Sequence, residues 1–338
     1  MRQCTAYKSR YCVNGTLIPS KIYLDTNVYA RLVDTLAPTD YPRLALRLHA
    51  RSVRVYLSPT NILEFLQTRD AKRRKQLVCL AQFLCAEDLL VEVEAILVDQ
   101  VATATGDNRL SALRLESPFG SGGLAATWRD VRSDKRSTFL IDRGDLDRFQ
   151  IVKDMFKLLH AHLRRGGSAA DLWEHLPPLH ATTAAELRVQ VADALSRRRA
   201  AAPPSKNPLS IPFAACIQLM TLAVFCVGLS PFVASIDQFW ILLGISAAGE
   251  RFRYTLENLP FMLKEGCLVG MGQVMAHQAT HRYGPGNLFD CYHVCYTGLT
   301  DVTYTFDLRL LALNSTCPLR SPLRRMRPAD EFLAIAVG

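Results

Sequence analysis

The segment KIYLDTNVYARL, residues 21–32, decides the fold class of this chain. Residues 21–24 form a strand-like run, and a helical pattern follows directly after the polar residues Asp25, Thr26 and Asn27. An aspartate at the end of a strand is typical of a helix cap, because its carboxylate accepts hydrogen bonds from free backbone N–H groups. The position also suits a metal ligand, because open α/β sheets place their sites at the carboxyl ends of their strands. Taken alone, this segment favours the interpretation of Asp25 as a helix cap over that of a metal ligand.

The composition is typical of a globular protein with a basic surface. Of 338 residues, 49% are hydrophobic, which is enough for a full core in one large domain or two ordinary ones. Lysine and arginine number 40 against 31 acidic residues, and the net charge of +9 suits a polyanionic partner. The ten cysteines include no C-x-x-C pair, which favours reduced thiols and a cytoplasmic location over a disulfide framework.

One apolar segment raises the alternative of a membrane anchor. Residues 211–229 carry no charge, are about long enough to cross a bilayer, and follow a basic run at 196–199. However, Gln218, the break at Ser230–Pro231 and Asp237 in the next apolar run favour a buried helical hairpin. Because the hairpin is favoured, we do not expect membrane association. The first residues lack the apolar core of a secretory signal, so we do not expect export by that route.

Strand and helix alternate in two separated parts of the chain. After the first segment come a strand at 53–57, a Ser58–Pro59 helix cap, one helix over 60–84 and an apolar run at 89–98 that suits either element. A second part has a helix within 284–298, a strand-like run over 301–313 and a final helical turn after 327. We therefore predict a three-layer α/β/α, Rossmann-like domain with a mainly parallel sheet, made of residues 1–105 and 255–338 and split by a mostly helical insertion at 106–254.

Four acidic residues fall at strand ends or helix starts on one presumed edge of this sheet: Asp25, Glu64, Asp290 and Asp307. Converging carboxylates repel one another unless cations lie among them, and hard oxygen ligands select Mg²⁺ or Mn²⁺. A pair of such ions about 3.5 to 4 Å apart activates water and stabilises the leaving oxygen of a phosphodiester. The pattern thus indicates nuclease chemistry.

These residues lie in segments that resemble the four acidic motifs of the PIN-domain ribonucleases, in the same order. The segments are LDTNVY (24–29), SPTNILEFL (58–66), NLFDCYHVCY (287–296) and DVTYTFD (301–307), and PADEFL (328–333) resembles the closing segment of that family. The resemblance implies that Asp25, Glu64, Asp290 and Asp307 hold the metal, with Asp301 as an extra or substitute ligand. It also implies orienting or substrate-binding roles for Thr26, Asn27, Asn287, Thr305 and Arg309, with His293 as a flanking polar position.

The resemblance thus predicts a metal-dependent endoribonuclease whose partner is RNA. The long interval from Glu64 to Asp290 departs from compact members, so the insertion is expected to cover the site, bind a protein or second copy, or redirect specificity. Plainer alternatives stay open: a non-catalytic RNA-binding or scaffold protein on this fold, Asp25 and Glu64 as helix caps, Asp301 as a turn cap, and His293 as an ordinary helix-face histidine. The basic run RDAKRRK (69–75) suits either a solvated helix face or contact with RNA phosphates.

Overall fold

The computed structural model describes residues 12–13, 16–17, 20–117, 153–154, 157, 160–161, 225, 234–247, 250–251, 253–255, 257–258, 266–279, 286–317 and 321–337. Its strands are β1 (Cys12–Val13), β2 (Thr16–Leu17), β3 (Lys21–Leu24), β4 (Arg54–Leu57), β5 (Cys85–Leu89), β6 (Val302–Thr305) and β7 (Met326–Pro328). Its α-helices are α1 (Thr26–Thr35), α2 (Tyr41–Ala50), α3 (Pro59–Gln67), α4 (Ala71–Leu84), α5 (Val93–Thr105), α11 (Ala234–Leu243), α13 (Cys267–Ala279), α14 (Asn287–Thr297), α15 (Leu308–Thr316) and α16 (Ala329–Val337). Short 3-10 turns cover Pro38–Asp40, Asn108–Leu113 and Pro322–Arg325.

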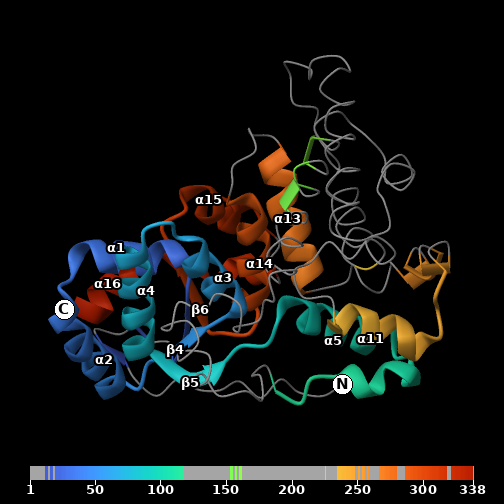
Figure 1. Cartoon of the computed structure of the whole chain (residues 1–338), viewed down its shortest axis with the longest axis horizontal. Helices are drawn as coiled ribbons and strands as arrows, with labels where there is room; N and C mark the ends of the chain where they lie inside the picture. The colour runs from blue at the N-terminus through green and yellow to red at the C-terminus, as the bar shows by residue number, and fades with distance from the viewer. Residues whose placement is uncertain are drawn as a thin grey trace.

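The main sheet has five strands in the order β5-β4-β3-β6-β7, and every neighbouring pair is parallel. The chain builds outward from β3 through β4 to β5, and then returns to the other side of β3 to add β6 and β7 (Figure 1). This reversal makes the carboxyl ends of β3 and β6 the place where connections diverge, as in doubly wound sheets. The α/β class and the parallel sheet predicted from the sequence are confirmed.

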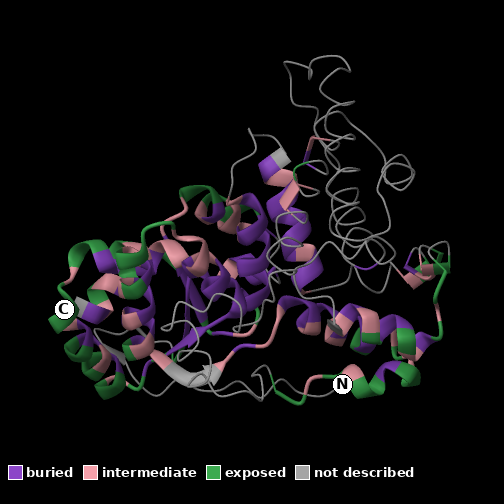
Figure 2. Ribbon diagram, viewed as in Figure 1, coloured by how far each residue is buried: buried purple, intermediate pink, exposed green. Residues whose placement is uncertain are grey.

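Two apolar clusters lie on the two faces of the sheet. Ile22 and Leu24 of β3 pack into one cluster with α1, α2, α4 and α16. Tyr23 points to the opposite face and packs with α5, α11, α13 and α14. The alternation follows from the two-residue period of a strand. In Figure 2 the strands are buried between these helices, an arrangement compatible with three α/β/α layers.

The single helix predicted over 60–84 is wrong, because the chain forms two helices there. Thr68 has extended backbone angles, φ −62° and ψ 116°, and ends α3. Asp70 then caps α4, and its carboxylate accepts hydrogen bonds from the N–H groups of Lys72 (2.8 Å) and Arg73 (3.3 Å). A good N-cap residue therefore starts a new helix inside the apolar pattern.

In two other apolar runs the secondary structure differs from the one that the pattern suggests. The run 89–98 contains the end of β5 and the start of α5, so it is both strand and helix. The strand-like run 301–313 holds only four strand residues before Asp307 caps α15. β7 was not anticipated: it has three residues, including Pro328, and lies at the edge of the sheet, where a missing N–H is tolerated.

Helix α11 of the predicted insertion packs on the core, because Ile236 and Phe239 lie in the same apolar cluster as Leu97 and Val101 of α5. Within the insertion, Arg109 Nη1 donates a hydrogen bond to Leu243 O (3.0 Å), and Trp240 Nε1 donates one to Phe225 O (2.8 Å). Apart from the buried Phe225, the hairpin expected at 211–229 lies outside the described residues. Among the described helices, none has the length and apolar character needed to span a bilayer. The division into 1–105, 106–254 and 255–338 stays a prediction.

Candidate functional site

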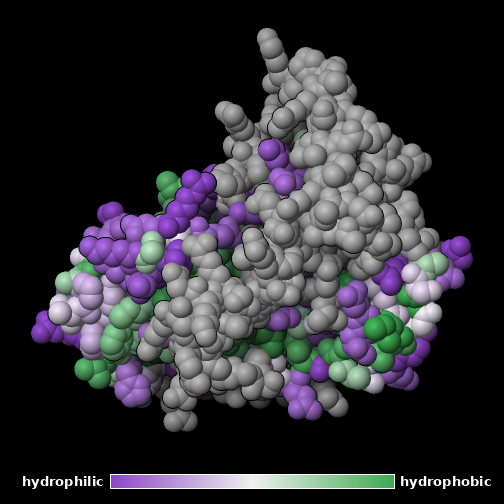
Figure 3. Space-filling view, in the orientation of Figure 1, coloured by the Kyte–Doolittle hydropathy of each residue, from purple (hydrophilic) through white to green (hydrophobic). Residues whose placement is uncertain are grey.

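Side chains from four elements meet at the carboxyl edge of the sheet, beside the divergence between β3 and β6. Asp25 follows β3, and Asp307 follows β6. Glu64 comes from α3, which follows β4, and Asp290 and His293 come from α14, which leads into β6. We call these five residues the Asp25 cluster. Figure 3 shows that the visible surface around α1 and α15, which both begin at this edge, is mostly hydrophilic.

Asp25 is buried, and polar neighbours hold its carboxylate in place. Its Oδ2 accepts hydrogen bonds from Thr305 Oγ1 (2.6 Å) and Asn27 Nδ2 (2.7 Å). Asn27 Oδ1 in turn accepts from the N–H of Phe306 (3.1 Å), which ties the start of α1 to the end of β6. Although Asp25 occupies the N-cap position of α1, its side chain makes no cap hydrogen bond. The cap interpretation of Asp25 is therefore wrong.

Glu64 points from α3 toward Asp25, and α1 supports it. Thr26 Oγ1 donates a short hydrogen bond to Glu64 Oε2. Asn61 Nδ2 donates to Thr26 Oγ1 (3.1 Å) and to Leu24 O (3.1 Å), so the first turn of α3 is fixed to the end of β3. The capping box between Ser58 and Asn61 sets the start of α3 and hence the direction of Glu64.

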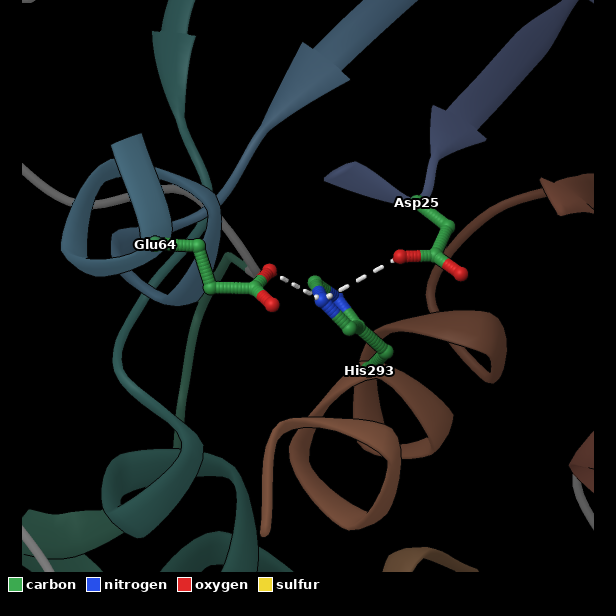
Figure 4. A group of neighbouring side chains, drawn as sticks. All are labelled: Asp25, Glu64 and His293. Carbon is green, nitrogen blue, oxygen red and sulfur yellow. Dashed lines mark hydrogen bonds and ion pairs between the residues drawn. The ribbon is translucent and has the colours of Figure 1, made fainter. Parts of the chain in front are cut away.

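His293 lies between the two carboxylates (Figure 4). Its Nε2 is 2.7 Å from Glu64 Oε2 and 3.5 Å from Asp25 Oδ1. Its Nδ1 is 2.6 Å from the Tyr23 hydroxyl, which is 2.7 Å from Ser58 Oγ. Ser58 Oγ donates onward to Asn61 Oδ1 (3.0 Å). With Nδ1–H donating to Tyr23 and the Tyr23 hydroxyl donating to Ser58, this chain directs Nε2 at the carboxylates.

Asp290 and Asp307 extend the cluster along the edge. Asp290 Oδ2 accepts from Gln278 Nε2 (2.9 Å) and is 3.9 Å from Arg309 Nη2. Asp307 Oδ2 accepts from Arg309 Nη2 (2.7 Å), and its Oδ1 caps α15. A small pocket adjoins both acids and is lined by His277, Gln278, Asn287, Asp290, Asp307, Arg309 and Leu310.

The protonation of the cluster reflects its crowding. Burial raises the pKa of Asp25, as do Glu64 and Asp307, against the opposing effect of His293. Burial and the carboxylates of Asp25 and Asp307 raise the pKa of Asp290 to about 7.

The pKa values of His293 and Asp307 are set by their oppositely charged neighbours. Burial lowers the pKa of His293, but the carboxylates of Glu64, Asp25 and Asp290 outweigh burial and raise it to about 9. Burial raises the pKa of Asp307, but the hydrogen bonds and charge of Arg309 outweigh burial and lower it. The His293 imidazolium thus offsets part of the negative charge of the neighbouring carboxylates.

The donor set fits a divalent metal ion. Ligand atoms of Asp25, Glu64 and His293 all lie within 4.8 Å of one another. The hydrogen bond from Nδ1 to Tyr23 leaves Nε2 as the metal-facing atom, as in protein metal sites whose histidines are oriented by a second partner. Carboxylate and imidazole side chains are both common ligands of divalent metal ions in proteins.

Several predicted residues have positions other than those expected. Asp301 lies at the opposite end of β6, roughly 13 Å along the strand from Thr305. Its Oδ2 accepts hydrogen bonds from Ser20 N (3.0 Å) and Lys21 N (2.9 Å), so it cannot share an ion with Asp25. Asn287 begins α14, and its carbonyl accepts from Gln278 Nε2 (3.0 Å), so it supports Asp290.

The basic run 69–75 is not one continuous surface. Arg74 is buried, and its Nη1 donates to Thr68 O (2.7 Å). Arg73 pairs with Asp34 at 2.6 Å, while Lys72 and Lys75 are exposed. The run also lies on α4 rather than on the helix of Glu64. Two of the five cations thus have structural partners, whereas Arg69, Lys72 and Lys75 are exposed, and for these three both a solvated helix face and contact with RNA phosphates stay predictions.

The central place of His293 was missed, because it was interpreted as a flanking or ordinary helix-face residue. One signal was present: His293 lies three residues after Asp290, so the two share a helix face. Tyr23, Ser58 and Gln278 as supporting residues had no comparable signal, because their partners are remote in sequence.

No protein-family model matches this chain, and no match was found among curated proteins or solved structures.

Proposed function

We propose that this protein is a metal-dependent ribonuclease with a PIN-like fold that hydrolyses RNA phosphodiester bonds at the Asp25 cluster. One observation carries the proposal: four carboxylates from four separate segments converge with a histidine at the carboxyl edge, where burial together with Asp25 and Asp307 raises the pKa of Asp290 and where burial together with Glu64 and Asp307 raises that of Asp25. Natural folds rarely gather buried carboxylates without a cation to neutralise them.

In the proposed mechanism, Asp25, Glu64 and His293 Nε2 would hold Mg²⁺ or Mn²⁺, and Asp290 and Asp307 would complete the acidic edge. When bound, such an ion would supply an activated water and charge stabilisation for the leaving oxygen of the phosphodiester. Thr305 and Asn27 keep the Asp25 carboxylate in one orientation, and Thr26 does the same for Glu64. Arg309 is about half exposed and lies beside the pocket at Asp290, where it would bind a substrate phosphate.

The test compares RNA cleavage by the wild type with that by Asp25→Asn and Asp290→Asn. We expect wild-type cleavage of a labelled single-stranded RNA that requires Mn²⁺ or Mg²⁺ and stops with a chelator. Each variant should lose at least about a hundredfold in rate, in line with the loss of a metal ligand or its support. Circular dichroism should report an intact fold for both variants. Undiminished cleavage by either one would disprove the site assignment.

A specific observation favours a second candidate, a non-catalytic RNA-binding protein on the same fold. The His293 imidazolium already pairs with Glu64 and lies 3.5 Å from Asp25, so one positive charge offsets part of the charge of the cluster without metal. This alternative predicts RNA binding that is indifferent to divalent ions and no cleavage. Measuring RNA affinity with and without Mn²⁺, alongside the cleavage assay, separates the two functions.

A further inference from the structure

Two residues of the inserted segment reach the edges of the Asp25 cluster. Lys153 Nζ donates a hydrogen bond to Gln67 Oε1 (2.7 Å) at the end of α3. The same ammonium lies 5.2 Å from the ring centroid of Phe289, directly before Asp290 in α14. His160 Nε2 is 2.8 Å from Gln278 O, and the Gln278 side chain holds Asp290. Lys153 of the insertion therefore contacts α3, which carries Glu64, and α14, which carries Asp290.

The position of Lys153 relative to Glu64 is fixed by helix geometry. Gln67 lies three residues after Glu64 on α3, so the two side chains share a helix face. Glu64 accordingly acts electrostatically on Lys153, which is partly buried. The positive charge thus lies beside the helix that carries Glu64, whereas Arg309 contacts Asp290 and Asp307.

We propose that Lys153 is a substrate-binding residue, and that its ammonium contacts an RNA phosphate adjacent to the scissile one. The inference rests on the proposed ribonuclease function. When the metal binds one RNA phosphate, the adjacent phosphates of the strand still carry negative charge that the protein must neutralise. The lysine ammonium is a compact positive charge suited to that role. Gln67 and Phe289 hold the ammonium in place beside α3 and α14. The insertion thereby contributes directly to RNA binding instead of merely covering the core.

Binding to RNA tests this proposal independently of cleavage. Fluorescence anisotropy with a short 5′-labelled single-stranded RNA, in Mg²⁺ and over 50 to 300 mM KCl, is measured on the full chain carrying Asp25→Asn. Lys153→Gln should weaken binding about fivefold at 0.1 M KCl and reduce the salt slope by about 0.7, the value for one lost phosphate contact on a single strand. Lys153→Arg, which keeps the charge, should retain the slope.

Lys157 supplies the matched control, because it is an exposed, helical lysine on the same segment. Lys157→Gln makes the same change in net charge and should stay within about twofold of the parent. An unchanged slope for Lys153→Gln, an equal loss with Lys157→Gln, or an equal loss with Lys153→Arg would each overturn the proposal, the last by indicating a structural role. Failure of the ribonuclease function itself would appear separately, as absence of metal-dependent cleavage by the wild type.

Discussion

At the level of single residues, His293 determines how the cluster responds to pH. Its pKa rises from the ordinary 6.5 to about 9, so the imidazolium is favoured in the folded protein. The resulting stabilisation is fully present below pH 6.5 and is lost as pH rises through about 9. Asp290 acts in the same direction at lower pH: its pKa rises from 3.8 to about 7, so its contribution is lost as pH rises through 7.

We therefore predict that the free energy of unfolding of the metal-free protein falls as pH rises from 7 to 9. Urea unfolding in the presence of a chelator measures this, with His293→Gln as the reference. The variant lacks the titrating group, so its free energy of unfolding should change less than that of the wild type over this range. Equal changes in both proteins would mean that His293 does not carry the cationic charge of the cluster.

Part of this residue-level arrangement could be predicted from the sequence. Asp25, Glu64, Asp290 and Asp307 follow recognisable strand ends or helix starts, and the structure brings them to one edge. The role of His293 could not be predicted, because its partner Glu64 is 229 residues away and the contact depends on how α14 packs on the sheet. Asp301 was wrongly included as a ligand, because it precedes β6 and so lies at the amino end of the strand, away from the carboxyl edge that carries the site.

At the level of elements, the starts of α3 and α4 differ in what their caps hold. Asp70 caps α4 at an exposed position through backbone N–H groups. Ser58 caps α3 within the core and also binds the Tyr23 hydroxyl that orients His293. The N-cap residue of α4 therefore stabilises only its helix, whereas the N-cap residue of α3 also helps to position His293.

This difference gives a paired prediction for the two caps. Asp70→Ala should cost about 1 kcal/mol of unfolding free energy, the usual cost of a lost cap, and leave RNA cleavage unchanged. Ser58→Ala should cost more, roughly 2 to 4 kcal/mol, because the buried Tyr23 hydroxyl also loses its acceptor. It should also slow cleavage by disturbing His293. Equal effects of the two variants on both stability and cleavage would contradict the proposed orienting chain.

The elements also show why local patterns mislead at certain points. The apolar pattern of 60–84 is continuous, yet Thr68 and Asp70 end one helix and start another, a signal that periodicity does not register. β7 is too short to produce an alternating pattern and forms by pairing with β6. Strand β4 and the Ser58 cap were predictable, since β-branched residues and Ser-Pro act locally.

At the level of the whole molecule, the topology of the sheet creates the site. The order β5-β4-β3-β6-β7 sets the residues after β3 and β6 side by side, although about 280 residues of chain separate Asp25 from Thr305. Alternating strands and helices predict a parallel sheet, but the order of the strands and the docking of Lys153 and His160 depend on long-range packing.

The measurement that tests the central claim most directly is Mn²⁺ anomalous diffraction from crystals of the full chain. The account predicts an ion coordinated by Asp25 and Glu64, with His293 Nε2 turned from Glu64 to the metal and its Nδ1 still bonded to Tyr23. Asp25→Asn crystals soaked in the same way should show much weaker density there. The account would be contradicted if crystals soaked in millimolar Mn²⁺ showed no ion at the Asp25 cluster and His293 still bonded to Glu64.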